Sequence, residues 1–137
     1  MTAKNVKRSM AWHVSLWIVQ VLLAAMFLMV GYMKTFVPIG ELNKTVTIAA
    51  EMPILIRSIG ISELAAGIGL LLPAALRIRP RLTVLAAAGL LLVMVLAFVF
   101  HAIRGEYAAL GTTITLGALA GLVAWGRVYK APITARV

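Results

Sequence analysis

The sequence predicts an all-α membrane protein, an antiparallel up-down bundle of four transmembrane helices with both termini in the cytoplasm. Of its 137 residues, 63% are hydrophobic and only 12% are charged, whereas an ordinary soluble domain has roughly 25% charged residues. Four apolar runs have the length of a membrane span, and short turns join most of them. We expect residues 1–137 to form a single transmembrane domain.

The four apolar runs cover residues 11–33, 58–76, 82–100 and 108–125. Each holds 18 to 23 residues, which is enough for a helix across a hydrocarbon core of about 30 Å. Glu63 is the only Asp, Glu, Lys or Arg inside any of them. The first run is longer than the apolar part of a cleaved signal peptide, so it predicts an uncleaved span.

The basic residues predict the orientation, because cytoplasmic flanks of membrane spans carry an excess of Lys and Arg. Nine of them fall on the side that holds both termini: Lys4, Lys7, Arg8, Arg77, Arg79, Arg81, Arg127, Lys130 and Arg136. The other side holds Lys34, Lys44, Arg57 and Arg104, together with all four acids. Charges that flank spans favour lipid head groups as partners and argue against nucleic acid.

The connections between the spans differ in length. Residues 34–57 form the long one, and apolar residues recur there at near-helical spacing between Pro38 and Pro53. This pattern favours a short helix at the membrane interface, with a solvated connector as the alternative. In the tight connections, Pro80 suits the start of the third span and Gly105 suits the end of it. Spans joined by such turns should be antiparallel neighbours.

Glu63 is the first candidate site residue. An unpaired carboxylate in an apolar span is energetically costly, so its presence indicates a functional role or an ion pair. At 100° per residue, Gly60, Glu63 and Gly67 share one face of their helix. Glycines on that face permit close helix contact, so we expect it to point into the bundle. A purely structural ion pair is the alternative for Glu63. The sequence leaves the charge state of Glu63 open, because desolvation raises the pKa of a carboxyl and a nearby cation lowers it.

Two further stripes should face Glu63. Lys34 and Gln20 lie on one face of the first span, which carries polar and small residues. His101 lies at the end of a similar face of the third span. Lys34, His101 and the 104–106 turn belong at the same end of the bundle as Glu63, which should lie about 7 to 9 Å below the start of the second span. We therefore expect a pocket there with Glu63, Lys34 and His101 as its catalytic residues. Eight residues are expected to contact the ligand: Gln20, Phe27, Gly31, Gly60, Gly67, Met94, Arg104 and Glu106.

Other polar and small residues have simpler interpretations. His13 is expected at the membrane interface, and Trp12, Trp17 and Trp125 fit an aromatic belt. Gly117 and Gly121 form a small-xxx-small pair that favours helix packing inside the bundle, with a homo-oligomer interface as the alternative.

The sequence also excludes several chemistries. It contains no Cys, so the chain has no thiol site, no disulfide and no Cys-ligated metal. His13 and His101 are predicted at opposite ends of the membrane, so they cannot share a metal. No metal site is expected. Any redox role would depend on a bound small molecule or a partner protein.

Four motifs occur in a characteristic order: "GYMKTF" (31–36), "ELAAGIGLLLP" (63–73), "RPRL" (79–82) and "HAIRGEY" (101–107). Together they resemble the DoxX-like family of small four-helix membrane proteins over nearly the whole chain. The resemblance implies a multi-pass protein of the bacterial cytoplasmic membrane, with Lys34, Glu63, His101 and the Arg104–Glu106 turn as the matching polar positions. Family members named after a thiosulfate:quinone oxidoreductase subunit suggest quinone-linked redox work.

The leading hypothesis is an oxidoreductase or oxidoreductase subunit that binds a quinone or another lipophilic molecule near the extracytoplasmic side. Glu63 would exchange a proton or hydrogen bond with the ligand, while Lys34 and His101 would tune it. One alternative is a redox-free isomerase or hydrolase of a lipophilic metabolite. The other is a non-catalytic structural or ligand-binding subunit that holds a membrane or redox partner protein.

Overall fold

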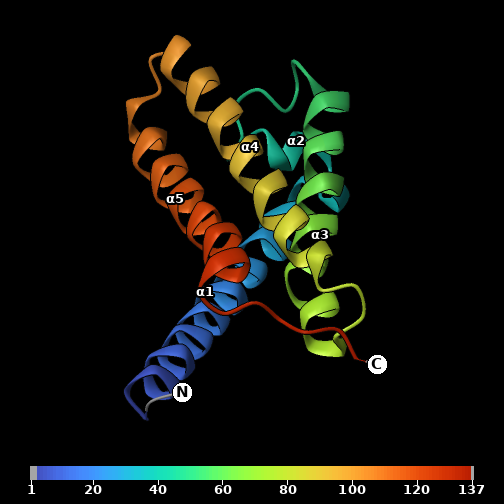
Figure 1. Cartoon of the computed structure of the whole chain (residues 1–137). Coiled ribbons are helices and arrows are strands. Elements are labelled where there is room, and N and C mark those ends of the chain that lie inside the picture. The colour runs from blue at the N-terminus through green and yellow to red at the C-terminus, as the bar shows by residue number, and fades with distance from the viewer. Residues whose placement is uncertain (1–2, 137) are drawn as a thin grey trace.

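The computed structural model describes residues 3–136 and consists of four long helices and one short helix (Figure 1). The helices are α1 (Ala3–Phe36), α2 (Ile39–Leu42), α3 (Pro53–Leu76), α4 (Arg81–Ile103) and α5 (Tyr107–Tyr129). The long helices pack antiparallel, and each is long and apolar enough to cross a membrane. The predicted bundle of four long antiparallel helices is confirmed, and the chain is a multi-pass membrane protein with four candidate spans.

The helices extend beyond the predicted apolar runs, and two of the extensions affect the site. Helix α3 begins at Pro53 rather than at residue 58, because proline suits the first turn of a helix, where its missing N–H has no partner to lose. Glu63 therefore lies ten residues, or about 15 Å of helix rise, from the start of α3, which is deeper than expected. Helix α5 continues past Trp125 to Tyr129 and so includes Arg127.

The three predicted inward faces point into the bundle. Helix α1 packs mainly against α3, and α4 packs mainly against α5. The buried residues on these faces are Gln20, Ala24, Phe27 and Gly31 of α1, Gly60, Glu63 and Gly67 of α3, and Thr83, Ala87, Leu90 and Met94 of α4. Large apolar side chains such as Leu22, Leu85 and Leu92 cover the outside and are at least 60% exposed. A surface of this kind suits lipid.

The connection between α1 and α3 contains the expected short helix, although α2 is only four residues long. Residues 43–52 continue as a series of turns. Leu42, Ile48 and Ala49 are buried together with Ile56 of α3, and Phe100 of α4 packs against this cluster. The connection is thus a packed cap on the end of the bundle rather than a solvated linker.

The opposite end of the bundle is closed by the carboxyl-terminal segment. Residues 130–136 leave α5 and cross toward the α3–α4 turn (Figure 1), where the backbone N–H of Arg136 donates a 2.9 Å hydrogen bond to the carbonyl of Arg77. Ala131 of this segment is buried. We call this end the Arg127 end and the other the Glu63 end. Gly105 closes the α4–α5 turn at the Glu63 end with a φ of 70°, as its sequence context predicts.

Candidate functional site

Lys34 and Glu63 form an ion pair inside the Glu63 end. The Nζ of Lys34 donates a hydrogen bond of 2.7 Å to Oε1 of Glu63. Their side chains are 18% and 2% exposed, respectively, so Lys34 reaches toward the surface while Glu63 does not. The predicted meeting of these two residues is therefore present in the structure.

Glycines allow this contact because they bring α1 and α3 close together. A Cβ atom added to Gly60 would lie 2.7 Å from Cβ of Lys34, and one added to Gly31 would lie 2.8 Å from the carbonyl oxygen of Gly60. Both distances are shorter than real Cβ contacts, so neither position accepts a side chain without a shift of the helices. Gly31 and Gly60 thus act as packing residues in this structure, and they permit the Lys34 stem to cross α3.

The second carboxylate oxygen of Glu63 has a different status. Glu63 Oε2 is buried and has no hydrogen-bond partner within the described residues. A buried carboxylate oxygen without a donor is energetically costly. Glu63 consequently offers one unused acceptor beside the ammonium group of Lys34.

Arg57 fixes the end of α1 next to this pair, a role that the sequence did not reveal. Its Nη1 and Nη2 donate hydrogen bonds of 2.7 Å each to the backbone carbonyls of Lys34 and Val37. The last carbonyls of a helix have no partner inside the helix, so a guanidinium group can satisfy them. Arg57 therefore positions the residue that pairs with Glu63.

His101 is at the expected end of the bundle but has a different partner. Its Nδ1 lies 2.5 Å from Oε2 of Glu106, and the structure records no hydrogen bond or ion pair between His101 and Glu63 in residues 3–136. Arg104 Nε donates a 2.8 Å bond to the other oxygen of Glu106, and its Nη1 lies 3.8 Å from Glu51. These residues form a second polar group in the α4–α5 turn.

The charges in this turn affect one another. The hydrogen bond from Arg104, followed by that from His101, lowers the pKa of the Glu106 carboxyl, and the pKa of Arg104 is raised mainly by its hydrogen bond to Glu106. Both shifts favour the charged forms. The turn is therefore held by charge-assisted hydrogen bonds, and it lies at the same end as Lys34 without contacting Glu63.

The other expected ligand contacts are distributed along the bundle. Phe27 and Met94 belong to the apolar core, and a Cβ atom on Gly67 would lie 2.8 Å from Leu28. Gln20 is fully buried but lies 14 residues from Lys34, which corresponds to about 21 Å along the helix. Gln20 therefore does not share the level of Lys34 and Glu63, whereas Phe27, Gly67 and Met94 have apolar or close-packed surroundings in this structure.

Gln20 instead belongs to a buried polar network at the Arg127 end. Its amide nitrogen donates a 2.8 Å bond to the carbonyl of Leu70, and its amide oxygen accepts a bond from Nε of Arg127. Arg127 is 3% exposed, and its guanidinium also lies 5.3 Å from the Trp17 ring centroid. Its Nη1 is 3.2 Å from Nδ1 of His13 and 3.3 Å from the carbonyl oxygen of Ala131.

Hydropathy alone does not indicate that Arg127 is buried, because the last apolar run ends at Trp125, two residues before it. A usable signal was present: Thr113, Gly117 and Ala120 follow helical spacing, and Arg127 lies seven residues after Ala120 on the same face. All four residues are buried in the structure.

His13, expected at the membrane interface, is exposed and accepts a 3.1 Å hydrogen bond from Trp17.

The sequence model of the DoxX-like family matches residues 18–123. The chain belongs to the DoxX-like family. No curated protein and no solved structure matches it.

The polar groups at the two ends of this DoxX-like protein differ in whether the family match covers them. Lys34, Glu63 and the 101–106 turn lie inside it, whereas His13 and Arg127 lie outside it. No group of three or more His, Asp or Glu side chains within the described part of the chain is arranged to hold a metal ion. The Glu63 end carries two polar groups: the Lys34–Glu63 pair with Arg57 beside it, and the group of His101, Arg104 and Glu106.

Proposed function

We propose that this DoxX-like protein binds a lipophilic molecule of the quinone class at the Lys34–Glu63 pair, as a membrane oxidoreductase or a subunit of one. The observation that carries the proposal is the buried Oε2 of Glu63, which has no partner in the described residues and lies beside a lysine ammonium. Quinones and quinols combine an apolar ring with carbonyl or hydroxyl oxygens. Such a ligand matches an apolar bundle that has one acceptor and one donor to offer.

The two residues have complementary roles in this proposal. Glu63 as a carboxylate accepts a hydrogen bond or a proton from a quinol hydroxyl, and Lys34 donates to a carbonyl oxygen and stabilises negative charge on it. Low polarity around the pair strengthens both interactions. The chain has no Cys, so the electrons belong to the bound molecule and to a redox partner protein.

His101 has a supporting role in this proposal. Its hydrogen bond to Glu106 keeps the α4–α5 turn folded at the end where the ligand would enter. The distribution of basic residues supports a cytoplasmic location for both termini, so we infer that the Glu63 end faces the extracytoplasmic side of the bacterial cytoplasmic membrane.

Quinone binding can be tested on the protein purified in mild detergent. Retained small molecules are identified by mass spectrometry, and the protein is then titrated with a quinol while its intrinsic tryptophan fluorescence is recorded. We expect a quinone to co-purify with the native protein and the quinol to bind to it. Glu63→Gln should weaken quinol binding by about tenfold or more, since it removes a charged acceptor.

The matched control is Glu41→Gln, which makes the same chemical change in an exposed pair with Lys44. It should bind quinol like the native protein. Equal binding by all three proteins, or no binding by the native protein, would overturn the assignment.

A second candidate function is a structural one, in which Lys34 and Glu63 serve only to hold α1 against α3. The close glycine contacts and the Arg57 hydrogen bonds at the same place favour it. Replacing a buried ion pair as a whole is often tolerated far better than removing one partner. Full activity or partner binding in the double variant Lys34→Met, Glu63→Gln, with loss in each single variant, would support this structural role over ligand binding.

A further inference from the structure

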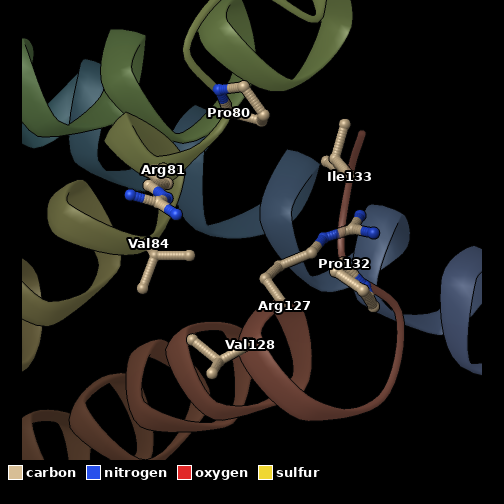
Figure 2. A pocket seen from close by; sticks show the side chains of 7 residues that line it. All are labelled: Pro80, Arg81, Val84, Arg127, Val128, Pro132 and Ile133. Atoms are coloured by element: carbon tan, nitrogen blue, oxygen red, sulfur yellow. The ribbon is translucent and has the colours of Figure 1, made fainter. Parts of the chain in front are cut away.

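A pocket of about 340 Å³ lies at the Arg127 end, outside the proposed ligand site. Figure 2 shows its two arginines, Arg81 from the start of α4 and Arg127 from the end of α5, on opposite sides. The rest of the lining is apolar: Pro80, Val84, Val128, Pro132 and Ile133. Its volume falls in the lower part of the roughly 300–1,000 Å³ range of small-ligand sites. The pocket therefore combines positive charge with an apolar wall.

Arg127 has no negatively charged partner in the described residues. Its contacts are a glutamine oxygen, a backbone carbonyl, a histidine ring and a tryptophan ring, and its Nη2 is buried without any partner. A buried guanidinium normally has a carboxylate or another anion beside it, because burial of an unpaired charge is costly. This arginine lacks one.

The chain cannot easily supply that anion from its own side chains. The sequence contains four acidic residues, Glu41, Glu51, Glu63 and Glu106. Glu63 is engaged by Lys34, and the other three lie in the connections at the Glu63 end. Arg77, Arg79 and Arg81 add three more cations at the Arg127 end. An anion that neutralises this end must therefore come from outside the described residues.

Aromatic residues indicate the depth of the pocket in the membrane. The rings of Trp12 and Trp125 contact each other with centroids 5.8 Å apart, and the ammonium of Lys130 lies 5.0 Å from the Trp125 centroid. Tryptophan and lysine together are typical of the level of the lipid head groups. Arg127 follows Trp125 by two residues, so the pocket lies near that level.

We propose that this pocket binds the phosphate group of an anionic phospholipid, with Arg81 and Arg127 as its charged contacts. The guanidinium fork of Arg81 can donate to two phosphate oxygens at once, and the unpaired Nη2 of Arg127 adds a further donor. The apolar wall accommodates the first part of the lipid that follows the phosphate. The bound phosphate supplies the missing counter-charge of Arg127. The bound lipid also fastens the carboxyl-terminal segment to the α3–α4 turn.

The test uses the full-length protein in lipid nanodiscs that contain either phosphatidylglycerol or phosphatidylcholine. We compare lipids retained after detergent extraction by native mass spectrometry, and we record the melting temperature in each lipid. The native protein should retain phosphatidylglycerol preferentially and should melt at a higher temperature in it. Arg81→Gln should weaken retention by roughly tenfold, the effect of losing one charge-assisted contact.

Arg79→Gln is the matched control, since Arg79 is exposed in the same turn and does not line the pocket. It should retain phosphatidylglycerol like the native protein. Arg81 is itself exposed, so its replacement tests the pocket without disturbing the buried network. Arg127→Lys is a second variant, which keeps the charge but loses the unpaired Nη2 donor and should also weaken retention.

Three results would overturn the proposal. The native protein could show no preference for the anionic lipid, or Arg79→Gln and Arg81→Gln could weaken retention equally, which would indicate diffuse surface charge. Alternatively, millimolar inorganic phosphate could raise the melting temperature of the protein in phosphatidylcholine as much as phosphatidylglycerol does. That result would assign the pocket to free phosphate rather than to a lipid.

Discussion

The ammonium of Lys34 lies 2.7 Å from Oε1 of Glu63, and this contact joins the last turns of α1 to the middle of α3. Breaking a buried ion pair from one side leaves an unpaired charge and costs about 3–5 kcal/mol. Because Glu63 is only 2% exposed, it cannot reach water when Lys34 is replaced. We therefore expect Lys34→Met to lower the free energy of unfolding by about 3 kcal/mol, measured by thermal melting in detergent.

A double-variant cycle separates the pair from its surroundings. Lys34→Met combined with Glu63→Gln should recover part of the lost stability, with a coupling of roughly 1–3 kcal/mol. The control is Lys44→Met, because Lys44 pairs with Glu41 while their side chains are 70% and 63% exposed. Its effect should stay within about 0.5 kcal/mol. Additive effects of the two changes at Lys34 and Glu63 would contradict a coupled pair.

Close packing of α1 and α3 leads to a prediction about glycine. A methyl group at Gly60 would lie 2.6 Å from the Thr35 hydroxyl and 2.7 Å from the Lys34 Cβ atom. Helix association in a membrane depends on such contacts, because lipid provides no hydrophobic force between helices. Gly60→Ala should therefore destabilise the protein by about 1–3 kcal/mol.

Gly89 is the matched control for this prediction. Nothing lies within 4 Å of a Cβ atom at this position in α4, and alanine is the better helix former. Gly89→Ala should leave the melting temperature unchanged or raise it slightly. If both alanine variants melt alike, close contact at Gly60 does not contribute to stability.

The sequence predicts some of these contacts because regular helices have fixed geometry. Lys34 and Glu63 were expected to meet because each lies on an inward stripe near the same end, and a rise of 1.5 Å per residue gives their heights. The same arithmetic separates Gln20 from Lys34 by about 21 Å along α1, so Gln20 lies on the predicted inward face but bonds to Leu70 and Arg127 at the other end. Stripes identify the inward side but not which residues share a level.

Contacts that depend on turns and helix ends were not predictable in this way. His101 pairs with Glu106, five residues later, because a short loop brings its ends together at a small entropic cost. Arg57 binds carbonyls whose positions depend on the end of α1 and the packed connection after it. Arg127 follows the last apolar run, so the hydropathy pattern assigned it to a tail although α5 carries it into the interior.

The buried network at the Arg127 end predicts a large effect of Gln20. Gln20→Leu keeps a similar volume but removes the acceptor of Arg127 Nε and the donor to the Leu70 carbonyl. Leaving a buried charged group without its acceptor costs about 3 kcal/mol. We expect that loss in the free energy of unfolding, measured by thermal melting in detergent.

Two comparisons check this interpretation of Gln20. Ser62→Ala removes an exposed bond to the Ser58 carbonyl and should change stability by less than about 0.5 kcal/mol. The double variant Gln20→Leu, Arg127→Met removes both polar partners and should be more stable than Gln20→Leu alone. A double variant that is less stable than the single one would show that Arg127 stabilises the fold without Gln20.

The hydrogen bonds of Glu106 predict a pH dependence of stability. Arg104 and His101 lower the pKa of this carboxyl below its ordinary value near 4.5, because both favour the ionised form. A lowered pKa in the folded state contributes stability that is fully present above the ordinary value and is lost as the pH falls through the lowered one. The melting temperature should therefore fall on acidification below about pH 4.5, and Glu106→Gln should reduce that fall. Glu51, which also faces Arg104, is present in both proteins, so the difference between the two melting curves isolates Glu106. Parallel curves from neutral pH to about pH 3 would mean that Glu106 makes no pH-dependent contribution to the fold.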